Sequence, residues 1–97
     1  MREEVLELLK SVKNPFTGVD IVSEGLVSKI IEDEEGIQIY LAFARNTPPG
    51  PVSSALAWPV QARIVKDIVK VLEKAGVGKF EILDDTTLQR YYPPGDV

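Results

Sequence analysis

Four carboxylates are the side chains of this chain best suited to chemistry. Asp20 and Glu24 stand four residues apart, and Asp84 and Asp85 are adjacent. Carboxylate oxygens are the ligands that hard cations prefer, so these acids support the hypothesis of a small carboxylate-based, metal-dependent enzyme. Two adjacent acids fall far short of a calcium site, however, and no pair has evidently opposed environments for acid–base catalysis. The acids alone therefore indicate no catalytic residue, metal ligand or bound cofactor.

Two residue types that carry much of protein chemistry are missing. The 97 residues include no cysteine and no histidine. Without cysteine there are no disulfides and no thiolate ligands for an iron–sulfur cluster or a structural zinc ion. Without histidine the chain lacks the side chain whose ordinary pKa lies nearest to neutral pH. These absences exclude thiolate attack and histidine acid–base catalysis.

A proline-rich segment, Thr47-Pro-Pro-Gly-Pro51, is the other conspicuous feature. Proline interrupts the hydrogen bonding of helices and strands, so residues 45–57 are predicted to form an irregular loop. A loop of about a dozen residues is long for a small domain, and such loops are usually functional or mobile. Trp58 follows it, and the sequence leaves open whether Trp58 contacts a partner or packs into the core.

The pattern of apolar residues predicts the elements that position these features. It predicts a helix, two strands, a second helix and a third strand over residues 2–12, 26–32, 37–44, 59–75 and 79–83 in turn. Spacings of three and four indicate the helices, and strict alternation indicates the middle strand. Asn14-Pro15 ends the first helix, Pro59 suits the first turn of the second, and Gly76 suits its C-terminal cap.

This α-β-β-α-β order predicts an α+β fold. Two amphipathic helices bury their apolar sides together only if both lie on one face of the sheet, which gives a two-layer sandwich around a small mixed sheet. Residues 1–97 are expected to form a single domain, with a core spanning about 3–83 and an irregular tail over 84–97. In that tail, Tyr91 and Tyr92 could form a recognition segment, cover the sheet or belong to a disordered end.

Charge and hydropathy exclude other classes of partner. The chain has 11 basic and 15 acidic residues, giving a net charge of −4, and its basic residues are dispersed. Because a phosphate backbone would be repelled, we expect no nucleic-acid binding. No apolar run approaches the ~20 residues that cross a bilayer, and the charged first residues are unlike a signal peptide. We therefore expect no membrane contact and a cytoplasmic location.

The stretch Asn14-Pro-Phe-Thr-Gly-Val-Asp-Ile-Val-Ser-Glu-Gly-Leu-Val27 resembles the signature of the small iron–sulfur cluster assembly domain family. That family includes metal–sulfur cluster biosynthesis proteins and phenylacetate-degradation accessory proteins. The family phrase is similar to Asp-Ile-Val-x-Leu-Gly-Leu-Val, and Glu24 stands here where leucine is usual. Many members also place a cysteine in a Thr-x-x-Cys-Pro loop, where this chain has Gly50. The resemblance covers about residues 3–83.

The resemblance implies a role in making or delivering iron–sulfur clusters, mostly through protein contacts. On this basis we expect a non-enzymatic accessory or adaptor protein that contacts iron–sulfur carrier, scaffold or client proteins and that can form a homodimer. Because Gly50 supplies no thiolate, cluster binding by this chain alone is not expected. The candidate interaction loop comprises Asp20, Glu24, Arg45, Thr47, Pro48, Gly50 and Trp58.

Several of these residues also have a purely structural interpretation. Asp20 could hold the Thr47 loop or simply close a local turn. Thr47 could orient a ligand or bridge to Asp20, or could form a local backbone bond. Gly50 could admit a partner's backbone or simply make a turn. A regulatory interaction domain that kept the fold and changed its partners is a further alternative.

Overall fold

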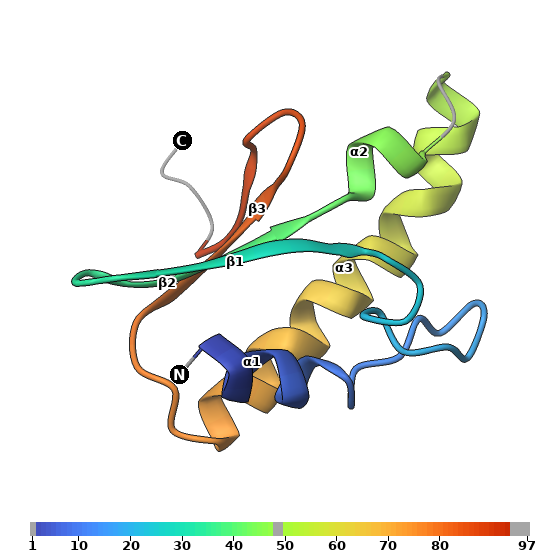
Figure 1. Cartoon of the computed structure of the whole chain (residues 1–97). Helices are drawn as coiled ribbons and strands as arrows, with labels where there is room; N and C mark the ends of the chain where they lie inside the picture. Colours follow the sequence, from blue (N-terminus) through green and yellow to red (C-terminus); the bar gives the residue numbers. More distant parts are fainter. Residues whose placement is uncertain (1, 48–49, 94–97) are drawn as a thin grey trace.

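Two helices on one face of a four-stranded sheet form the body of the protein (Figure 1). The computed structural model describes residues 2–47 and 50–93. In chain order the elements are α1 (Arg2–Leu9), β1 (Val27–Asp33), β2 (Gly36–Leu41), α2 (Phe43–Asn46), α3 (Pro51–Lys74), β3 (Phe80–Asp84) and β4 (Arg90–Tyr92). Helices α1 and α3 cover the same side of the sheet, which confirms the predicted two-layer α+β fold.

The sheet is mixed, as predicted, with the strand order β1-β2-β3-β4. Strands β1 and β2 form an antiparallel hairpin, β2 and β3 are parallel, and β3 and β4 are antiparallel. The carboxylate of Asp33 closes the hairpin turn by accepting the N–H groups of Glu35 at 2.9 Å and Gly36 at 3.1 Å. Helix α3 makes the crossover between the parallel pair, the connection that such a pair requires.

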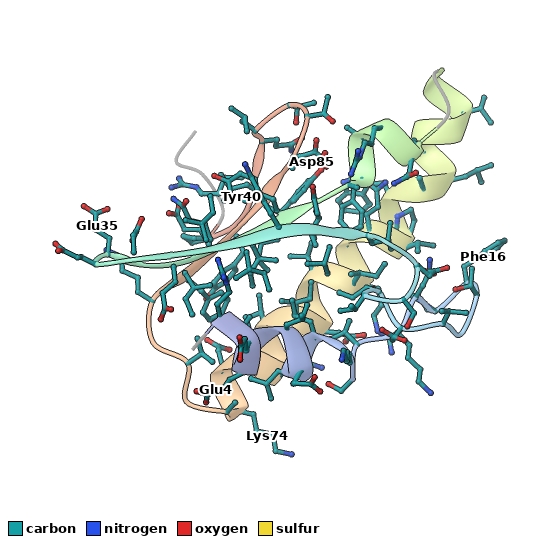
Figure 2. The ribbon with its side chains drawn as sticks, in the orientation of Figure 1. Glu4, Phe16, Glu35, Tyr40, Lys74 and Asp85 are labelled. Carbon is teal, nitrogen blue, oxygen red and sulfur yellow. The ribbon has the colours of Figure 1, made fainter. Side chains whose placement is uncertain are left out.

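The core lies between the sheet and the two helices, where Figure 2 shows side chains filling the space. Most of its fully buried members come from α1, β2, α3 and β3, and include Val5, Leu9, Ile39, Leu41, Ile64, Ile68, Leu72 and Ile82; Ile21 joins them from the loop before β1. Tyr40 lies on the opposite face of the sheet, with the Lys29 ammonium 4.7 Å from its ring centroid. The spacing of three and four in α3 and the alternation in β2 therefore produce this core, as their patterns indicate.

The predicted irregular tail is wrong in its first part. Residues 90–92 form strand β4, which pairs with β3 through Ile82↔Tyr92 and Leu83↔Arg90. The ring of Tyr92 stacks on Phe80 with centroids 5.2 Å apart, so Tyr92 covers the sheet. Aromatic pairs at this separation add stability beyond the area that they bury, which explains why so short a strand is held. Residues 94–97 lie outside the described part of the chain.

The predicted irregular loop over 45–57 is also wrong. Residues 43–46, where the sequence predicts the end of a strand and the start of this loop, form the short helix α2. Helix α3 begins at Pro51, eight residues before its predicted start at Pro59. Pro59 therefore lies in the interior of the helix. Pro51 suits a first turn because that turn needs no N–H donor, and the run Ala55-Leu-Ala57 has high helix propensity. Pro48 and Pro49 lie outside the described residues.

The C-terminal end of α3 follows the prediction. Gly76 has a φ of +78°, and the N–H of Val77 donates to the carbonyl of Leu72 at 3.0 Å. This is the hydrogen bond of a glycine-terminated helix end. The buried side chain of Val77 then joins the core, so the chain turns directly toward β3.

Gly36 is the position where the sheet tolerates no side chain. Its φ is +142°, and a Cβ there would collide with the carbonyl oxygen of Lys79, which already accepts the N–H of Ile37 at 3.0 Å. We expect Gly36→Ala to lower the free energy of unfolding by about 2 kcal/mol, because strain and collision add. Urea denaturation followed by circular dichroism measures this loss.

Gly78→Ala is the matched control, because a Cβ at Gly78 meets nothing within 4 Å. Its unfolding free energy should stay unchanged or rise by up to about 1 kcal/mol as the unfolded chain loses freedom. Equal losses in the two variants would show that the Lys79 contact is not what restricts Gly36.

Candidate functional site

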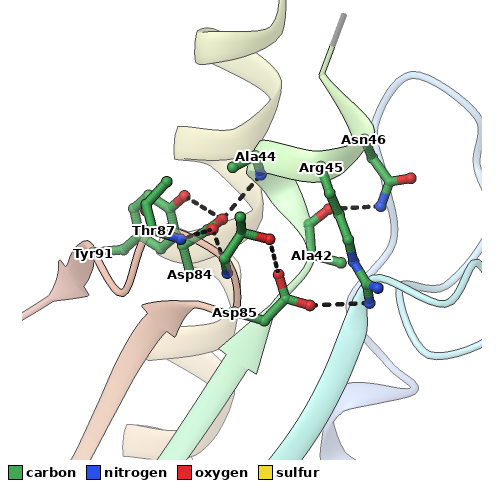
Figure 3. A network of polar contacts seen from close by, with 9 residues as sticks. Ala42, Ala44, Arg45, Asn46, Asp84, Asp85, Thr87 and Tyr91 are labelled. Atoms are coloured by element: carbon green, nitrogen blue, oxygen red, sulfur yellow. Dashed lines mark hydrogen bonds and ion pairs between the residues drawn. The ribbon is translucent and has the colours of Figure 1, made fainter.

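A buried carboxylate, Asp84, lies at the end of β3 and binds four donors (Figure 3). Its Oδ1 accepts the N–H of Ala44 and the hydroxyl of Tyr91, each at 2.9 Å. Its Oδ2 accepts the N–H groups of Thr86 at 2.9 Å and Thr87 at 3.0 Å. Each oxygen therefore has two donors, which is how a charge can be buried without a cation.

Asp84 also caps α2 from a distant part of the chain. The residue before α2, Ala42, has no side chain that can accept a hydrogen bond from the helix. The N–H of Ala44, in the first turn, would be an unsatisfied donor, and Asp84 satisfies it across 40 positions of sequence. The carboxylate also places negative charge at the start of the helix.

The neighbouring Asp85 fixes the exposed side of α2. Its Oδ2 lies 2.9 Å from Nη2 of Arg45, and its N–H donates to the carbonyl of Leu41 at 2.9 Å. Asn46 donates to the carbonyl of Ala42 at 2.6 Å. Asp84 and Asp85 thus both hold α2 in place. Within residues 2–47 and 50–93, no group of three or more histidine, cysteine or acidic side chains could hold a metal ion.

The two partners in the buried pair have opposite pKa shifts. Burial raises the pKa of Asp84, but the hydrogen bonds from Thr87, Ala44, Thr86 and Tyr91 outweigh it and hold this pKa below its ordinary value. Burial and the hydrogen bond to Asp84 strongly raise the pKa of the Tyr91 phenol. Asp84 is therefore ionised and Tyr91 protonated at neutral pH, which is the pairing that the hydrogen bond needs.

Thr47 connects α2 to α3. Its hydroxyl donates to the carbonyl of Phe43 at 2.8 Å and accepts a hydrogen bond from Nε2 of Gln61 at 2.8 Å. The local hydrogen bond to the backbone that was predicted for Thr47 is present, and it lies at the C-terminal end of helix α2. The side chain of Gln61 then fixes the distance between the end of α2 and the middle of α3.

Asp20 closes a local turn, as its structural interpretation predicts. Its Oδ2 accepts the N–H of Ser23 at 3.0 Å, and hydrogen bonds from Ser23 hold the pKa of Asp20 below its ordinary value. In the described part of the chain, the contacts of Thr47 are to Phe43 and Gln61, so no bridge joins Thr47 to Asp20.

Glu24 fixes the loop formed by residues 14–24. Its Oε1 accepts a hydrogen bond from Nδ2 of Asn14 at 3.0 Å, and its Oε2 accepts one from the hydroxyl of Thr17 at 2.8 Å. The Oδ1 of Asn14 accepts the N–H of Phe16 at 2.9 Å. The ring of Phe16 is nevertheless 85% exposed, and it projects from the loop away from the body of the protein (Figure 2).

An open groove of about 710 Å³ lies between this loop, the end of α2 and the first half of α3. We call it the Phe16–Leu56 groove after the two exposed apolar side chains of its lining. Its lining also includes Glu24, Thr47 and Ile64. Two residues predicted for the interaction loop, Glu24 and Thr47, thus lie on one concave surface.

Four other residues predicted for the interaction loop are not in the described lining of this groove: Asp20, Arg45, Gly50 and Trp58. Arg45 is held by its ion pair with Asp85, and Gly50 directly precedes α3 with a φ of +118°. Pro48 lies outside the described residues. Trp58 is 68% exposed, so its interpretation as a core residue is wrong. It lines a second groove on a different face of α3.

The family model of the iron–sulfur cluster assembly proteins matches residues 2–79 of this chain. The chain belongs to this family. The resemblance in the sequence is thereby confirmed. The chain is also 37% identical over 82 residues to an uncharacterized protein, MJ1129, of Methanocaldococcus jannaschii, an alignment that covers 84% of this chain and 77% of that protein.

A solved structure supports the same fold. The crystal structure of a domain of unknown function, DUF59, from Bacillus anthracis is similar to this chain with a TM-score of 0.67 and 28% identity. The similarity covers 98% of this chain and 78% of that one. It therefore includes the β3–β4 turn with Asp84, which lies beyond the residues matched by the family model.

The donor set of these 97 residues does not fit a resident iron–sulfur cluster. Cluster iron is held by thiolates and, in some centres, by histidine, and this sequence contains neither residue. The groove lining offers one ionisable side chain, Glu24, and both of its carboxylate oxygens already accept hydrogen bonds. In the part of the chain that the structure describes, no helix is long and apolar enough to cross a membrane.

Replacing Asp84 tests the support of α2. The amide nitrogen of Asp84→Asn would have to face N–H groups that now donate to a carboxylate, so we expect the free energy of unfolding at neutral pH to fall by about 2 kcal/mol. Asp67→Asn is the control, because Asp67 forms only an exposed pair with Arg63 at 3.3 Å. The control should lose less than about 0.5 kcal/mol in urea denaturation.

The Asp84→Asn variant also tests how the free energy of unfolding depends on pH. The pKa of Asp84 is lower in the folded than in the unfolded protein, so its stabilisation is complete above about pH 4 and is lost as the pH falls through the folded pKa. The unfolding free energies of the wild type and Asp84→Asn should therefore converge in acid. A gap that stays constant from neutral to acidic pH would contradict the ionised, hydrogen-bonded Asp84.

Proposed function

We propose that this chain is a non-enzymatic accessory protein of iron–sulfur cluster assembly that contacts a carrier, scaffold or client protein through the Phe16–Leu56 groove. Membership of the family supports the pathway. The observation that carries the protein-contact role is the exposed aromatic ring of Phe16, held on a hydrogen-bonded loop at the edge of a concave surface.

The loop and the helix that line this groove carry several exposed apolar side chains. Phe16 and Val19 on the loop are 85% and 43% exposed, and Val52 and Leu56 on α3 are 71% and 74% exposed. Val52 and Leu56 stand four residues apart, so they lie on the same side of the helix. Exposed apolar surface of this kind commonly marks a protein-interaction site, and buried aromatic residues dominate the binding energy of such sites.

The hydrogen bonds of the loop favour binding over catalysis. Two side-chain bonds to Glu24 and one to Asn14 hold residues 14–24 before any partner arrives, so little conformational freedom remains to be lost on association. The groove brings no nucleophile and base together, since Glu24 is the one ionisable residue in its described lining. These features suit a preformed contact surface.

The proposal predicts that Phe16→Ser combined with Leu56→Ser weakens partner capture by roughly tenfold, the effect typical of losing exposed aromatic and apolar contacts at an interface. The tagged protein is cross-linked in the cells that produce it, and captured proteins are quantified by mass spectrometry. Iron–sulfur carriers, scaffolds or client proteins should be enriched with the wild type and lost with the variant.

The control for this experiment is Leu88→Asn. Leu88 is a comparably exposed apolar residue, at 64%, but it lies in the turn after β3 and its φ of +63° suits asparagine. This variant should capture the same proteins as the wild type. Enrichment of no iron–sulfur protein by a folded wild type, or equal capture by all three proteins, would refute the proposed contact surface.

A second prediction separates an accessory protein from a cluster carrier. After anaerobic incubation with ferrous iron and sulfide and subsequent desalting, the purified chain should retain neither iron nor visible absorbance. The reason is the absence of soft thiolate ligands. A chromophore that survives desalting would show that other ligands hold a cluster, and would contradict the accessory role.

A further inference from the structure

A second groove, of about 700 Å³, lies between α3 and the short strand β4. We call it the Trp58–Tyr92 groove, with Trp58, Val65 and Val69 of α3 and Tyr91 and Tyr92 of β4 in its lining. The ring contacts of Tyr91 with Phe43 and of Tyr92 with Phe80 fix the β4 side. The groove therefore has an apolar and aromatic surface that is already ordered.

The charged side chains that line this groove are basic, whereas the net charge of the protein is negative. Its lining contains Lys66, Lys70 and Arg90 and no acidic residue, whereas the chain as a whole has a net charge of −4. Lys66 and Lys70 stand four residues apart and so lie on one side of α3. Neither forms an ion pair within the residues that the structure describes, while Arg90 lies 3.6 Å from Glu81. Two unpaired ammonium groups thus stand beside an apolar floor.

The β4 side of the groove is the last strand of the sheet. In the described residues β4 pairs with β3 alone, so the other edge of β4 has no strand partner. An unpaired strand edge can accept an extended segment from another protein through backbone hydrogen bonds, while adjacent pockets receive alternate side chains. An extended peptide suits this groove better than a helix does.

We propose that the Trp58–Tyr92 groove binds an acidic, extended segment of a partner protein. Carboxylates of the segment contact Lys66 and Lys70, and its apolar side chains occupy the floor formed by Val65, Val69 and Tyr92. This contact lies mainly on a different face of α3 from the Phe16–Leu56 groove, although Gln61 is in the lining of both. A nucleic acid fits less well, because the net charge of −4 opposes a phosphate backbone outside the groove.

The test uses a random peptide library displayed on phage and selected against the immobilised full chain. Peptides with several acidic residues and apolar residues at alternate positions should be enriched. A synthetic copy of the most enriched peptide is then titrated into the protein. Trp58 is the single tryptophan of the chain and is 68% exposed, so binding in this groove should shift its fluorescence to shorter wavelength.

Charge-reversal variants test whether the peptide binds in the Trp58–Tyr92 groove. Lys66→Glu combined with Lys70→Glu should weaken the peptide by roughly tenfold, because two attractive contacts become repulsive. Lys13→Glu combined with Lys74→Glu makes the same change in net charge at exposed lysines outside the groove lining. This control should stay within about twofold of the wild type, and binding should weaken as salt is added. Circular dichroism confirms that both variants are folded.

Three results would overturn the proposal. The first is enrichment of basic or uncharged peptides, or equal binding by the two double variants. The second is an oligothymidine strand that binds through Lys66 and Lys70 and displaces the peptide, which would make the ligand a nucleic acid. The third is self-association that Lys66→Glu with Lys70→Glu abolishes in sedimentation, which would make the occupant a second copy. The Phe16→Ser, Leu56→Ser variant should bind the peptide as the wild type does. The experiments can therefore refute the binding proposed for one groove without refuting the binding proposed for the other.

Discussion

The structure depends on one buried negative charge. The Asp84 carboxylate joins two segments that the sequence keeps far apart, the start of α2 and the turn between β3 and β4. Because α2 begins without a local cap, this carboxylate sets where the helix starts. The end of α2 then positions Thr47, whose hydroxyl receives Gln61 of α3. The position of the α2 side of the Phe16–Leu56 groove thus depends on the Asp84 carboxylate, which is not in the groove lining.

Local sequence patterns predicted the parts of the fold that local interactions decide. The alternation of Ile37, Ile39 and Leu41 predicted β2, and the spacing of Ile64, Ile68 and Leu72 predicted the buried face of α3. Helix α2 and strand β4 were missed because each is too short for its apolar pattern to repeat: α2 has four residues, about one turn, and β4 has three. Both are held by distant partners, α2 by Asp84 and β4 by β3, and such partners leave no mark on neighbouring residues.

The candidate site was predictable to a similar extent. Glu24 and Thr47 were both predicted for the interaction loop, and both line the Phe16–Leu56 groove. Phe16 and Leu56 were missed, since 40 positions separate them and they line one groove only in the folded chain. The Pro-Phe-Thr-Gly turn held the available signal, because an aromatic residue between turn formers has few core neighbours. For Trp58 the sequence left a partner contact and a core position open, and the core position is wrong because the side chain is 68% exposed.

The described side chains in the first turns of α3, before Pro59, are not buried in the core. Among side chains that the structure describes, the buried ones of this helix all follow Pro59, at Ile64, Ile68 and Leu72. A helix that started at Pro59, as the sequence predicted, would complete the same core. The preceding turns instead carry Leu56 toward one groove and Trp58 toward the other, and both side chains are mostly exposed. Exposed apolar residues give a lone chain no burial energy, so this extension of α3 agrees with the contacts to other molecules that we propose.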